Sequence, residues 1–403
     1  MRLTVQRDAF AEAVAWAARA LPTRPVIPVL AGLLLRASED QLTLACFDYE
    51  VSARVAVPAE VTEPGTALVP GRLLLEITRS LPGQPVRFAD DPDGVVLTCG
   101  EASFTLVTLP PDDYPALPDL PQRAGTVDGG EFAAAIGQVV PAASKDDTLP
   151  LLTAVNLELA DETMTLAATD RYRLAVRDLG WAPAEGQPHA TALIPARVLA
   201  DAARMMTAGA PVRIMLREAG HEGAAADGAM IGFEAGERRL TTRLLAGEFP
   251  RYRERFPTVF GCVAELPAEA FAEAVRRVSL VAERGTPVQL TFGGNRVTMV
   301  ASTQGQARAR EAVPARFSGD EPAIAFSPLY LLDGVVAATT GAQHGTGATE
   351  DDDDEGAGDG DHGEAAVRIQ FTSPSKPAVI TAATGSQRDA AGGFRYLVVP
   401  QRV

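Results

Sequence analysis

The chain has 403 residues, of which 46% are hydrophobic and 22% charged, so it has the composition of a soluble globular protein of two to four domains. No apolar run approaches the roughly 18 residues that span a bilayer, and the N-terminal residues lack a signal-peptide core. The widely spaced Cys46, Cys99 and Cys262 favour buried thiols over a disulfide framework. We therefore expect a cytoplasmic protein.

The net charge of −16 is unevenly distributed along the chain. Residues 350–364, EDDDDEGAGDGDHGE, hold nine acids and no base, so the net charge of all other residues is −7. With its Gly-rich flanks this block spans 341–366, and its composition indicates a disordered insertion. Its aspartates lack the glycine and glutamate placement of a calcium loop, so we predict no metal site, and no cofactor motif is present.

The first predicted element is an amphipathic helix, DAFAEAVAWAARAL, and its pattern recurs twice, as GEFAAAIGQVVPAA and EAFAEAVRRVSLVA. The strands that follow these helices also match, as LTLACFDYEVSARVAV, MTLAATDRYRLAV and VTMVASTQGQARAREAV. Phe10 precedes Phe132 by 122 residues, and Asp48 precedes Asp170 by the same 122. One offset shared by a helix and a strand indicates an internal repeat.

A second half-unit follows in each repeat, as TALVPGRLLLEITRSL, TALIPARVLADAARMM and, more loosely, AIAFSPLYLLDGVVAA. Each is a strand followed by an amphipathic helix, and the segments PPDDYPALP and AGEFPRYRERFP close the first two repeats. We therefore predict an α+β fold of three repeated domains, at 1–123, 124–261 and 262–403. Each domain has two strand–helix–strands halves, with helices on one face of antiparallel sheets.

The repeated acids Asp48 and Asp170 allow two interpretations, a pair of catalytic carboxylates or two turn residues. The third repeat has Thr303 at the matching place, which favours turn residues. No Ser-His-Asp set, phosphate-binding loop or Gly-rich dinucleotide turn appears in the sequence. We therefore predict that the protein is not an enzyme.

Arginines recur on the predicted helices, opposite the apolar stripes. DNA presents about one negative charge per 1.7 Å of its axis, so a track of such arginines would attract it without reading sequence. Aromatic residues are scarce on these faces, which favours duplex over single-stranded DNA. For any single helix, a merely solvated basic face is the alternative. The candidate DNA-binding residues are Arg72, Arg79, Arg197, Arg204, Arg276 and Arg277.

Four segments, RPVIPVLAGLLLRA, TDRYRLAV, FPRYRERFP and the C-terminal YLVVPQRV, resemble those of the bacterial sliding clamp, the beta subunit of DNA polymerase III, with actinobacterial character. The resemblance covers the whole chain except the acidic insertion. It implies a non-catalytic processivity factor, a head-to-tail homodimeric ring that encircles and slides on duplex DNA. Arg24 would contact DNA, and the subunits would join near Phe104 and Leu280.

The resemblance also implies a pocket between the second and third domains that holds short peptides from the replicative polymerase, the clamp loader and other partners. It explains the apolar end of the chain, since the tail would form one wall of that pocket. The implied pocket residues are Leu152, Thr169, Arg171, Tyr172, Arg173, Leu174, Pro250, Arg255, Val398, Val399, Pro400, Gln401, Arg402 and Val403.

The tail departs from the family pattern, which commonly ends in Met-Pro-Met/Val-Arg-Leu. Val399 and Gln401 take the places of more flexible or apolar residues, and Arg255 stands where an aliphatic residue is usual. One hypothesis is a housekeeping clamp with co-adapted partners. The other is a paralogous self-resistance clamp whose pocket rejects a cyclic peptide antibiotic. A repeat-built scaffold that binds proteins but no DNA is the alternative of another class.

Overall fold

The computed structural model describes residues 1–186, 189–206, 209–217, 228–283, 285–303, 306–319, 322–340, 365–383 and 393–402. Most of the predicted acidic insertion, 341–364, and the terminal Val403 lie outside the described residues. The chain divides into two compact units. The first unit comprises Met1–Gly130, Trp181–Pro188 and Ala200–Leu244, and the second comprises Glu131–Gly180, His189–Leu199 and Leu245–Val403.

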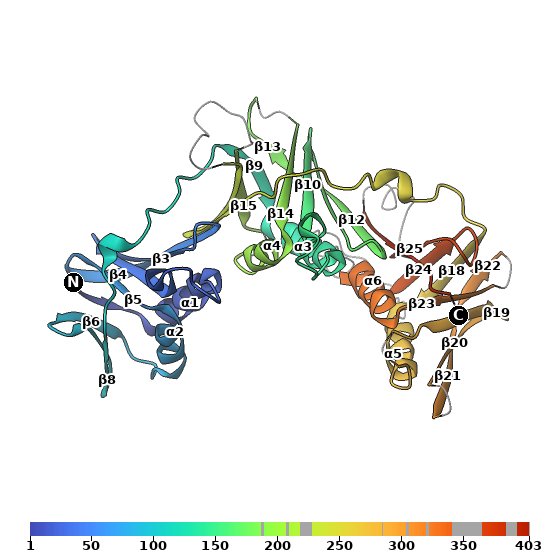
Figure 1. The fold of residues 1–403 in the computed structure, drawn as a ribbon, viewed down its shortest axis with the longest axis horizontal. Coiled ribbons are helices and arrows are strands. Elements are labelled where there is room, and N and C mark those ends of the chain that lie inside the picture. The colour runs from blue at the N-terminus through green and yellow to red at the C-terminus, as the bar shows by residue number, and fades with distance from the viewer. Residues whose placement is uncertain are drawn as a thin grey trace, which may run out of the picture. The chain divides into compact units, whose positions relative to one another are not determined.

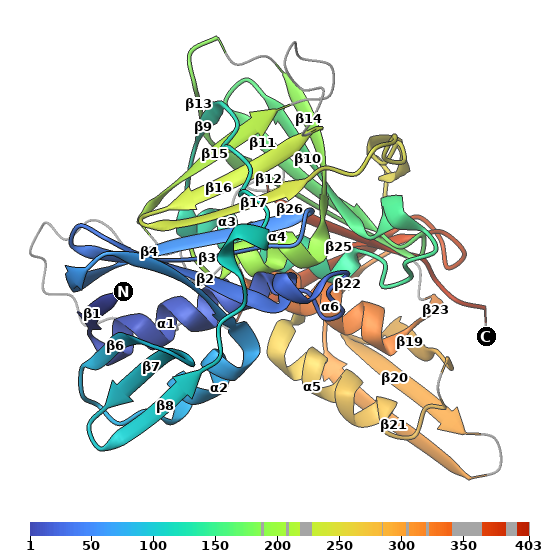
Figure 2. The same ribbon diagram turned by 60° about the vertical axis from the view of Figure 1, so that its left-hand side comes forward.

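The first unit is built on one antiparallel sheet of thirteen strands (Figures 1 and 2). In spatial order its main path is β13 (Ala182–Pro183), β9 (Arg123–Asp128), β15 (Pro211–Arg217), β16 (Met230–Ala235), β17 (Arg238–Arg243), β4 (Val51–Glu63), β1 (Arg2–Val5), β6 (Val86–Asp91), β7 (Gly94–Cys99) and β8 (Ala102–Leu106). Beside β4, the strand β3 (Gln41–Phe47) pairs with β2 (Gly32–Ser38), which pairs with β5 (Gly65–Pro70).

Two helices of the first unit, α1 (Arg7–Ala17) and α2 (Gly71–Ser80), pack side by side against its strands (Figure 2). On α1, Phe10 is fully buried and its ring meets that of Phe88 edge-on, with ring centroids 5.3 Å apart. On α2, Leu74 and Ile77 are buried, as the spacing of its apolar residues predicts.

The second unit contains two antiparallel sheets. The nine-stranded sheet runs in the order β14 (Ala190–Pro195), β10 (Ala154–Ala160), β11 (Thr163–Thr169), β12 (Arg173–Gly180), β26 (Phe394–Val398), β25 (Ala378–Ala382), β24 (Ala366–Phe371), β18 (Cys262–Pro267) and β22 (Arg316–Ser318). The four-stranded sheet runs β21 (Ala307–Pro314), β20 (Arg296–Thr303), β19 (Val288–Gly293) and β23 (Ala323–Phe326).

The remaining helices repeat the pattern of the first two. They are α3 (Gly129–Val139), α4 (Ala196–Ala203), α5 (Ala268–Ser279) and α6 (Pro328–Thr340), and α5 packs against α6 (Figure 1). Phe132 on α3 and Phe271 on α5 are fully buried, like Phe10 on α1. The predicted α+β class and the core role of the three phenylalanines are thus confirmed. Within the described ranges, no helix is long and apolar enough to cross a membrane.

Strand pairing joins segments of different repeats within each unit. In the first unit, β4 pairs with β17, and Ser52 lies opposite Thr241. In the second unit, β12 pairs with β26, and Leu174 lies opposite Leu397. We call these two places the β4–β17 junction and the β12–β26 junction, and the candidate site lies at the second.

Candidate functional site

A tight turn connects β11 to β12 at the edge of the site. The carboxylate Oδ1 of Asp170 accepts the backbone N–H groups of Tyr172 and Arg173, each at 3.0 Å. The hydroxyl of Thr169 donates to the carbonyl of Arg173 at 2.6 Å. These bonds hold Arg171 in the left-handed region, with φ 80°, at the tip of the turn.

The first repeat forms the same turn. The carboxylate Oδ1 of Asp48 accepts the N–H groups of Glu50 and Val51 at 3.0 and 2.7 Å, and Tyr49 adopts φ 75°. Asp48 and Asp170 therefore shape turns, which confirms the prediction from the sequence that they are turn residues.

Arg173, at the start of β12, is only 5% exposed and lies in a network of polar groups. Its Nε donates to Asp170 at 2.9 Å, and its Nη1 donates to Asp333 of α6. Its guanidinium lies 4.5 Å from the centre of the Tyr330 ring. Burial alone lowers the pKa of Arg173, but these carboxylates and the hydroxyl of Tyr396 outweigh burial and raise the pKa above its ordinary value. The arginine therefore stays charged and links the turn to α6.

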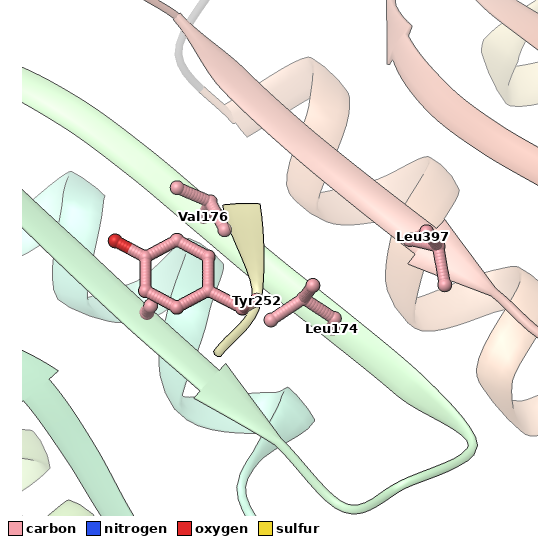
Figure 3. Close-up of a cluster of buried hydrophobic side chains, with 5 residues drawn as sticks. Leu174, Val176, Tyr252 and Leu397 are labelled. Atoms are coloured by element: carbon pink, nitrogen blue, oxygen red, sulfur yellow. The ribbon is translucent and has the colours of Figure 1, made fainter. Parts of the chain in front are cut away.

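Beside this network, at the β12–β26 junction, lies a cavity of about 310 Å³, which we call the β12–β26 pocket. Its floor is apolar and is formed by Leu174 of β12 and Leu397 of β26, with Val399 against them. Both leucines belong to one buried cluster with Tyr252 and Val176 (Figure 3). The residues that line the pocket are Leu152, Thr169, Arg171, Arg173, Leu174, Pro250, Arg251, Tyr252, Arg255, Pro377, Leu397 and Val399.

Tyr252 is fixed at both ends. Its ring packs on Leu174 and Val176 (Figure 3). Its hydroxyl donates to Glu158 at 3.0 Å. Arg253 pairs with the same glutamate. Burial, with the charge of Glu158 adding to it, raises the pKa of Tyr252, so the hydroxyl remains a neutral donor. The tyrosine is therefore a rigid wall of the pocket.

The pocket brings together eight of the residues that the sequence singles out, namely Leu152, Thr169, Arg171, Arg173, Leu174, Pro250, Arg255 and Val399. Tyr172 does not line the cavity; it is 54% exposed and stacks on Tyr330 with ring centroids 6.3 Å apart. Val398 is fully buried outside the lining, because successive residues of β26 alternate between faces.

The tail beyond β26 is held by its backbone. Val399 donates its N–H to the carbonyl of Tyr172 at 2.9 Å, and Gln401 donates to that of Ala325 at 2.8 Å. Pro400 is half-buried, Gln401 and Arg402 are exposed, and none of the three lines the cavity. The predicted Val403 lies outside the described residues.

Sequence reasoning did not name four lining residues, Arg251, Tyr252, Pro377 and Leu397. Tyr252 could have been found, because it lies in the FPRYRERFP signature and matches a tyrosine in the closing segment of the first repeat. Leu397 could have been found from the two-residue period of a strand, since it shares a face with Val399. Pro377 precedes β25 and carries no signal in the sequence.

The seven candidate DNA-binding arginines, Arg24, Arg72, Arg79, Arg197, Arg204, Arg276 and Arg277, are all exposed. Arg277 forms ion pairs with Glu273 at 3.2 Å and Glu311 at 2.7 Å, and Arg204 pairs with Asp201. The other five form no ion pair with any residue that the structure describes.

The candidate subunit contacts lie on an edge strand and at the end of a helix. Phe104 is half-buried on β8, the last strand of the main path in the first unit. Leu280, directly after α5, is 84% exposed. Among the residues described, no group of three or more His, Cys, Asp or Glu side chains is placed to hold a metal ion.

Comparison with known proteins gives consistent matches over the chain. Models of the DNA polymerase III beta subunit match its N-terminal domain at 1–118, its central domain at 126–251 and its C-terminal domain at 253–342. The beta sliding clamp of Streptomyces coelicolor is 45% identical over 403 residues and is covered completely, as is this chain. The beta sliding clamp homolog GriR of Streptomyces muensis is 38% identical, with 100% of this chain and 99% of that protein covered.

Solved structures share the fold. The sliding clamp of Bacillus subtilis superposes with a TM-score of 0.83 at 24% identity, covering 100% of this chain and 99% of that one. The Pseudomonas aeruginosa sliding clamp bound to griselimycin gives 0.83 at 24% identity, with both chains covered completely.

Proposed function

The chain belongs to the beta sliding clamp family, the beta subunit of DNA polymerase III, and we propose which of its residues perform the work of a processivity clamp. The protein is a non-catalytic processivity factor for that polymerase. The observation that carries this function is the 45% identity to the Streptomyces coelicolor clamp over the whole of both chains. We further propose three domains with bounds at 1–123, 124–261 and 262–403, and a place in the cytoplasm, where the DNA lies.

For DNA, the proposed contacts are the seven exposed arginines. On α2 and α5 they lie opposite the buried stripes, at Arg72 and Arg79 and at Arg276 and Arg277. Guanidinium groups bind phosphate oxygens without reading base sequence, as a sliding contact requires. Such contacts let an acidic chain hold duplex DNA, because only the surface that faces the duplex must be basic.

For the homodimer, the proposed contact joins β8 to the region of α5 and β21. β8 ends the main path of the first unit's sheet, and β21 ends the four-stranded sheet of the second. An unpaired edge strand is a template for pairing with another chain. Phe104 and the exposed Leu280 would supply apolar contacts at this head-to-tail interface, which closes a ring when two copies meet.

For partner proteins, the proposed site is the β12–β26 pocket. Leu174, Leu397 and Val399 offer an apolar floor for the anchoring side chains of a short peptide. Arg171, Arg251 and Arg255 are exposed at the same cavity and favour a peptide that carries an acid beside its apolar residues. The replicative polymerase, the clamp loader and other proteins with a clamp-binding motif would compete for this site.

A self-resistance clamp is the second candidate. The observation that favours it is that Arg255 and Val399, two of the departures from the family pattern, both line the pocket. The P. aeruginosa clamp binds griselimycin, so such a peptide is the ligand to test. The higher identity to the S. coelicolor clamp than to GriR favours the housekeeping role as the main function.

Topological retention tests the main function. A clamp loader would place the protein on nicked circular DNA, and gel filtration would measure how much stays bound. We expect retention on the circle and release after linearisation, and equal retention on both would contradict a ring.

Salt titration tests the arginines. Removing Arg24, Arg79 and Arg276 together by substitution with alanine should flatten the plot of log affinity against log salt concentration. We expect its slope to change by about 0.9 for each arginine removed, because each phosphate contact releases counterions. Arg87→Ala, an exposed arginine on β6, is the matched control and should leave the slope unchanged.

Griselimycin separates the two roles. If this chain is a housekeeping clamp, we expect it to bind griselimycin as tightly as the S. coelicolor clamp does. We expect the same agreement between the two clamps for a polymerase-derived peptide. For a self-resistance clamp we expect weaker griselimycin binding with the polymerase peptide unaffected, and restored binding in the Val399→Met variant. Equal inhibitor affinity in the two clamps would rule out the resistance role.

A further inference from the structure

A second cavity, of about 460 Å³, lies in the first unit between the strands β2 to β5 and the chain segment 111–117. We call it the Arg36–Arg54 cavity. All of its lining residues belong to the first unit. Arg36, Arg54 and Ala45 lie on its sheet wall, and Tyr114 and Leu117 lie on the wall formed by the chain segment.

The 122-residue offset between repeats explains why this cavity exists. Arg36, Ala45 and Arg54 correspond to Glu158, Ala167 and Val176. In the second repeat this place is filled, because Tyr252 packs on Ala167 and Val176 and its hydroxyl reaches Glu158.

In the first repeat the matching tyrosine turns elsewhere. Tyr114 packs with Leu30, Phe47 and Leu68, and its hydroxyl accepts the N–H of Phe47 at 2.7 Å. Leu30 and Phe47 correspond to Leu152 and Thr169, which line the β12–β26 pocket. The ring of Tyr114 therefore fills, in the first repeat, the place that is the β12–β26 pocket in the second. The ring of Tyr252 fills, in the second repeat, the place that is the Arg36–Arg54 cavity in the first.

The sheet wall of the Arg36–Arg54 cavity is basic. Arg36 and Arg54 are exposed, and neither side chain forms an ion pair or hydrogen bond with another residue in the described part of the chain. They flank β3: Arg36 lies opposite Thr43, and Arg54 lies opposite Ala45. Strand spacing and rise place their Cα atoms roughly 12 Å apart on one face of the sheet. The two small residues between them leave both guanidinium groups free to reach a ligand.

The opposite wall is mostly apolar, with Pro115 and Leu117, but it includes the carboxylate of Asp112. A phosphate dianion offers mainly acceptors, so Asp112 repels it. An extended peptide offers backbone N–H donors to Asp112 as well as acidic side chains to the arginines. Acids two residues apart in an extended chain lie on one face, roughly 7 Å from each other, within the span of the long arginine side chains.

We propose that the Arg36–Arg54 cavity binds an extended peptide of a partner protein in which acidic and apolar residues alternate. The acids pair with Arg36 and Arg54, and the apolar side chains face Pro115 and Leu117. The cavity is a second docking site on the chain, separate from the β12–β26 pocket, and the proposal does not depend on the function assigned to that pocket.

The test uses the full-length protein and the probe acetyl-Leu-Glu-Leu-Glu-Leu-amide. Because the β12–β26 pocket can also accept an acidic, apolar peptide, it is first saturated with a polymerase-derived peptide. Methyl NMR should then still show probe-dependent shifts at Leu34, Ala45 and Leu117, which line the Arg36–Arg54 cavity. Arg36→Gln with Arg54→Gln should weaken binding at least about tenfold, since each removes a charged hydrogen bond. Arg87→Gln is the control, because this exposed arginine lies on β6 and does not line the cavity.

A matched probe with glutamine in place of glutamate should bind at least about tenfold more weakly, since it keeps the apolar side chains but has no charge for the arginines. The proposal is overturned if the acidic probe shifts no methyl of the cavity, or if the double variant binds it as the unchanged protein does. Displacement of the probe by an equal concentration of inorganic phosphate would also overturn it, because the cavity would then be a site for small anions.

Discussion

The β4–β17 and β12–β26 junctions use the same strand pairing but opposite side-chain chemistry. At the first, Ser52 and Thr241 lie opposite each other, and their buried hydroxyls are hydrogen-bonded at 2.6 Å. At the second, the corresponding pair is Leu174 and Leu397, and it forms the floor of an open pocket. The β4–β17 junction is closed, because its two hydroxyls satisfy each other's hydrogen bonds and leave no binding surface. The β12–β26 junction is open, because its apolar pair faces a cavity and leaves apolar surface for a ligand.

The tyrosines strengthen this contrast. In the first repeat, Tyr114 packs over the apolar residues Leu30, Phe47 and Leu68. In the second repeat, Tyr252 leaves the matching apolar surface uncovered and forms a wall of the pocket. Repeated backbones therefore need few substitutions to turn a structural junction into a binding site.

The largest expected effect comes from removing Arg173, whose polar network supports the β12–β26 junction. Arg173→Ala leaves Asp170 and Asp333 without their buried cation, and we expect it to cost about 3 kcal/mol of unfolding free energy. Partner-peptide affinity should fall as the Thr169–Arg173 turn loosens. Denaturant melts and peptide titrations measure both effects.

Arg171→Ala is the control for that variant, since Arg171 lies in the same turn but is exposed. We expect it to change stability by less than about 0.5 kcal/mol. If Arg173→Ala proved no more destabilising than Arg171→Ala, the network would not be what holds the turn.

The next largest effect is expected when the apolar pair of the β12–β26 junction is replaced by the polar pair of the β4–β17 junction. Leu174→Ser with Leu397→Thr places the polar pair of the first junction in the floor of the pocket. We expect partner-peptide affinity to fall roughly 10- to 100-fold, because the apolar anchors of the peptide no longer have apolar surface to pack on. Isothermal titration with a polymerase-derived peptide measures it. The reverse pair, Ser52→Leu with Thr241→Leu, should leave that affinity unchanged, and a comparable decrease there would contradict the contrast.

A smaller effect is expected at the closed junction. Tyr114→Phe leaves the buried N–H of Phe47 without its acceptor, at a cost of about 1 to 2 kcal/mol in unfolding free energy. Tyr252→Phe should cost less, because Glu158 keeps its pairing with Arg253. Thermal melts of the two variants compare the tyrosines directly. A larger loss of stability in Tyr252→Phe than in Tyr114→Phe would contradict this expectation.

The smallest effect at neutral pH concerns Cys46, which precedes Phe47 at the closed junction. Burial raises the pKa of this thiol to about 12. The folded state therefore holds a proton that the unfolded state releases above pH 9, so stability should fall by up to about 1.4 kcal/mol per pH unit between pH 9 and 12. Denaturant melts across this range test it. Cys46→Ala should flatten the decline, and an identical decline in that variant would place its cause elsewhere.

The sequence predicted what the repeats share. The common offset located the Asp48 and Asp170 turns, and the helical spacing located the buried Phe10, Phe132 and Phe271. The offset could not predict the opposite packing of Tyr114 and Tyr252. That difference depends on neighbours far away in the sequence, such as Arg36 in one repeat and Glu158 in the other.

The tail shows a second limit. The family resemblance implied that the apolar end forms a pocket wall, but strand parity decides that Leu397 and Val399 line the cavity while Val398 does not. The position of Pro377 follows only from the pairing of β25 with β26, which sequence alone does not place.

The attachment of the tail has a consequence for how the clamp can change over time. Val399 and Gln401 are anchored through their main-chain N–H groups, which every residue except proline possesses. Mutations can therefore exchange the functional groups presented there while the peptide chain keeps its path. At Val399, which lines the pocket, a changed side chain can therefore alter ligand preference without weakening the backbone hydrogen bonds that hold the tail.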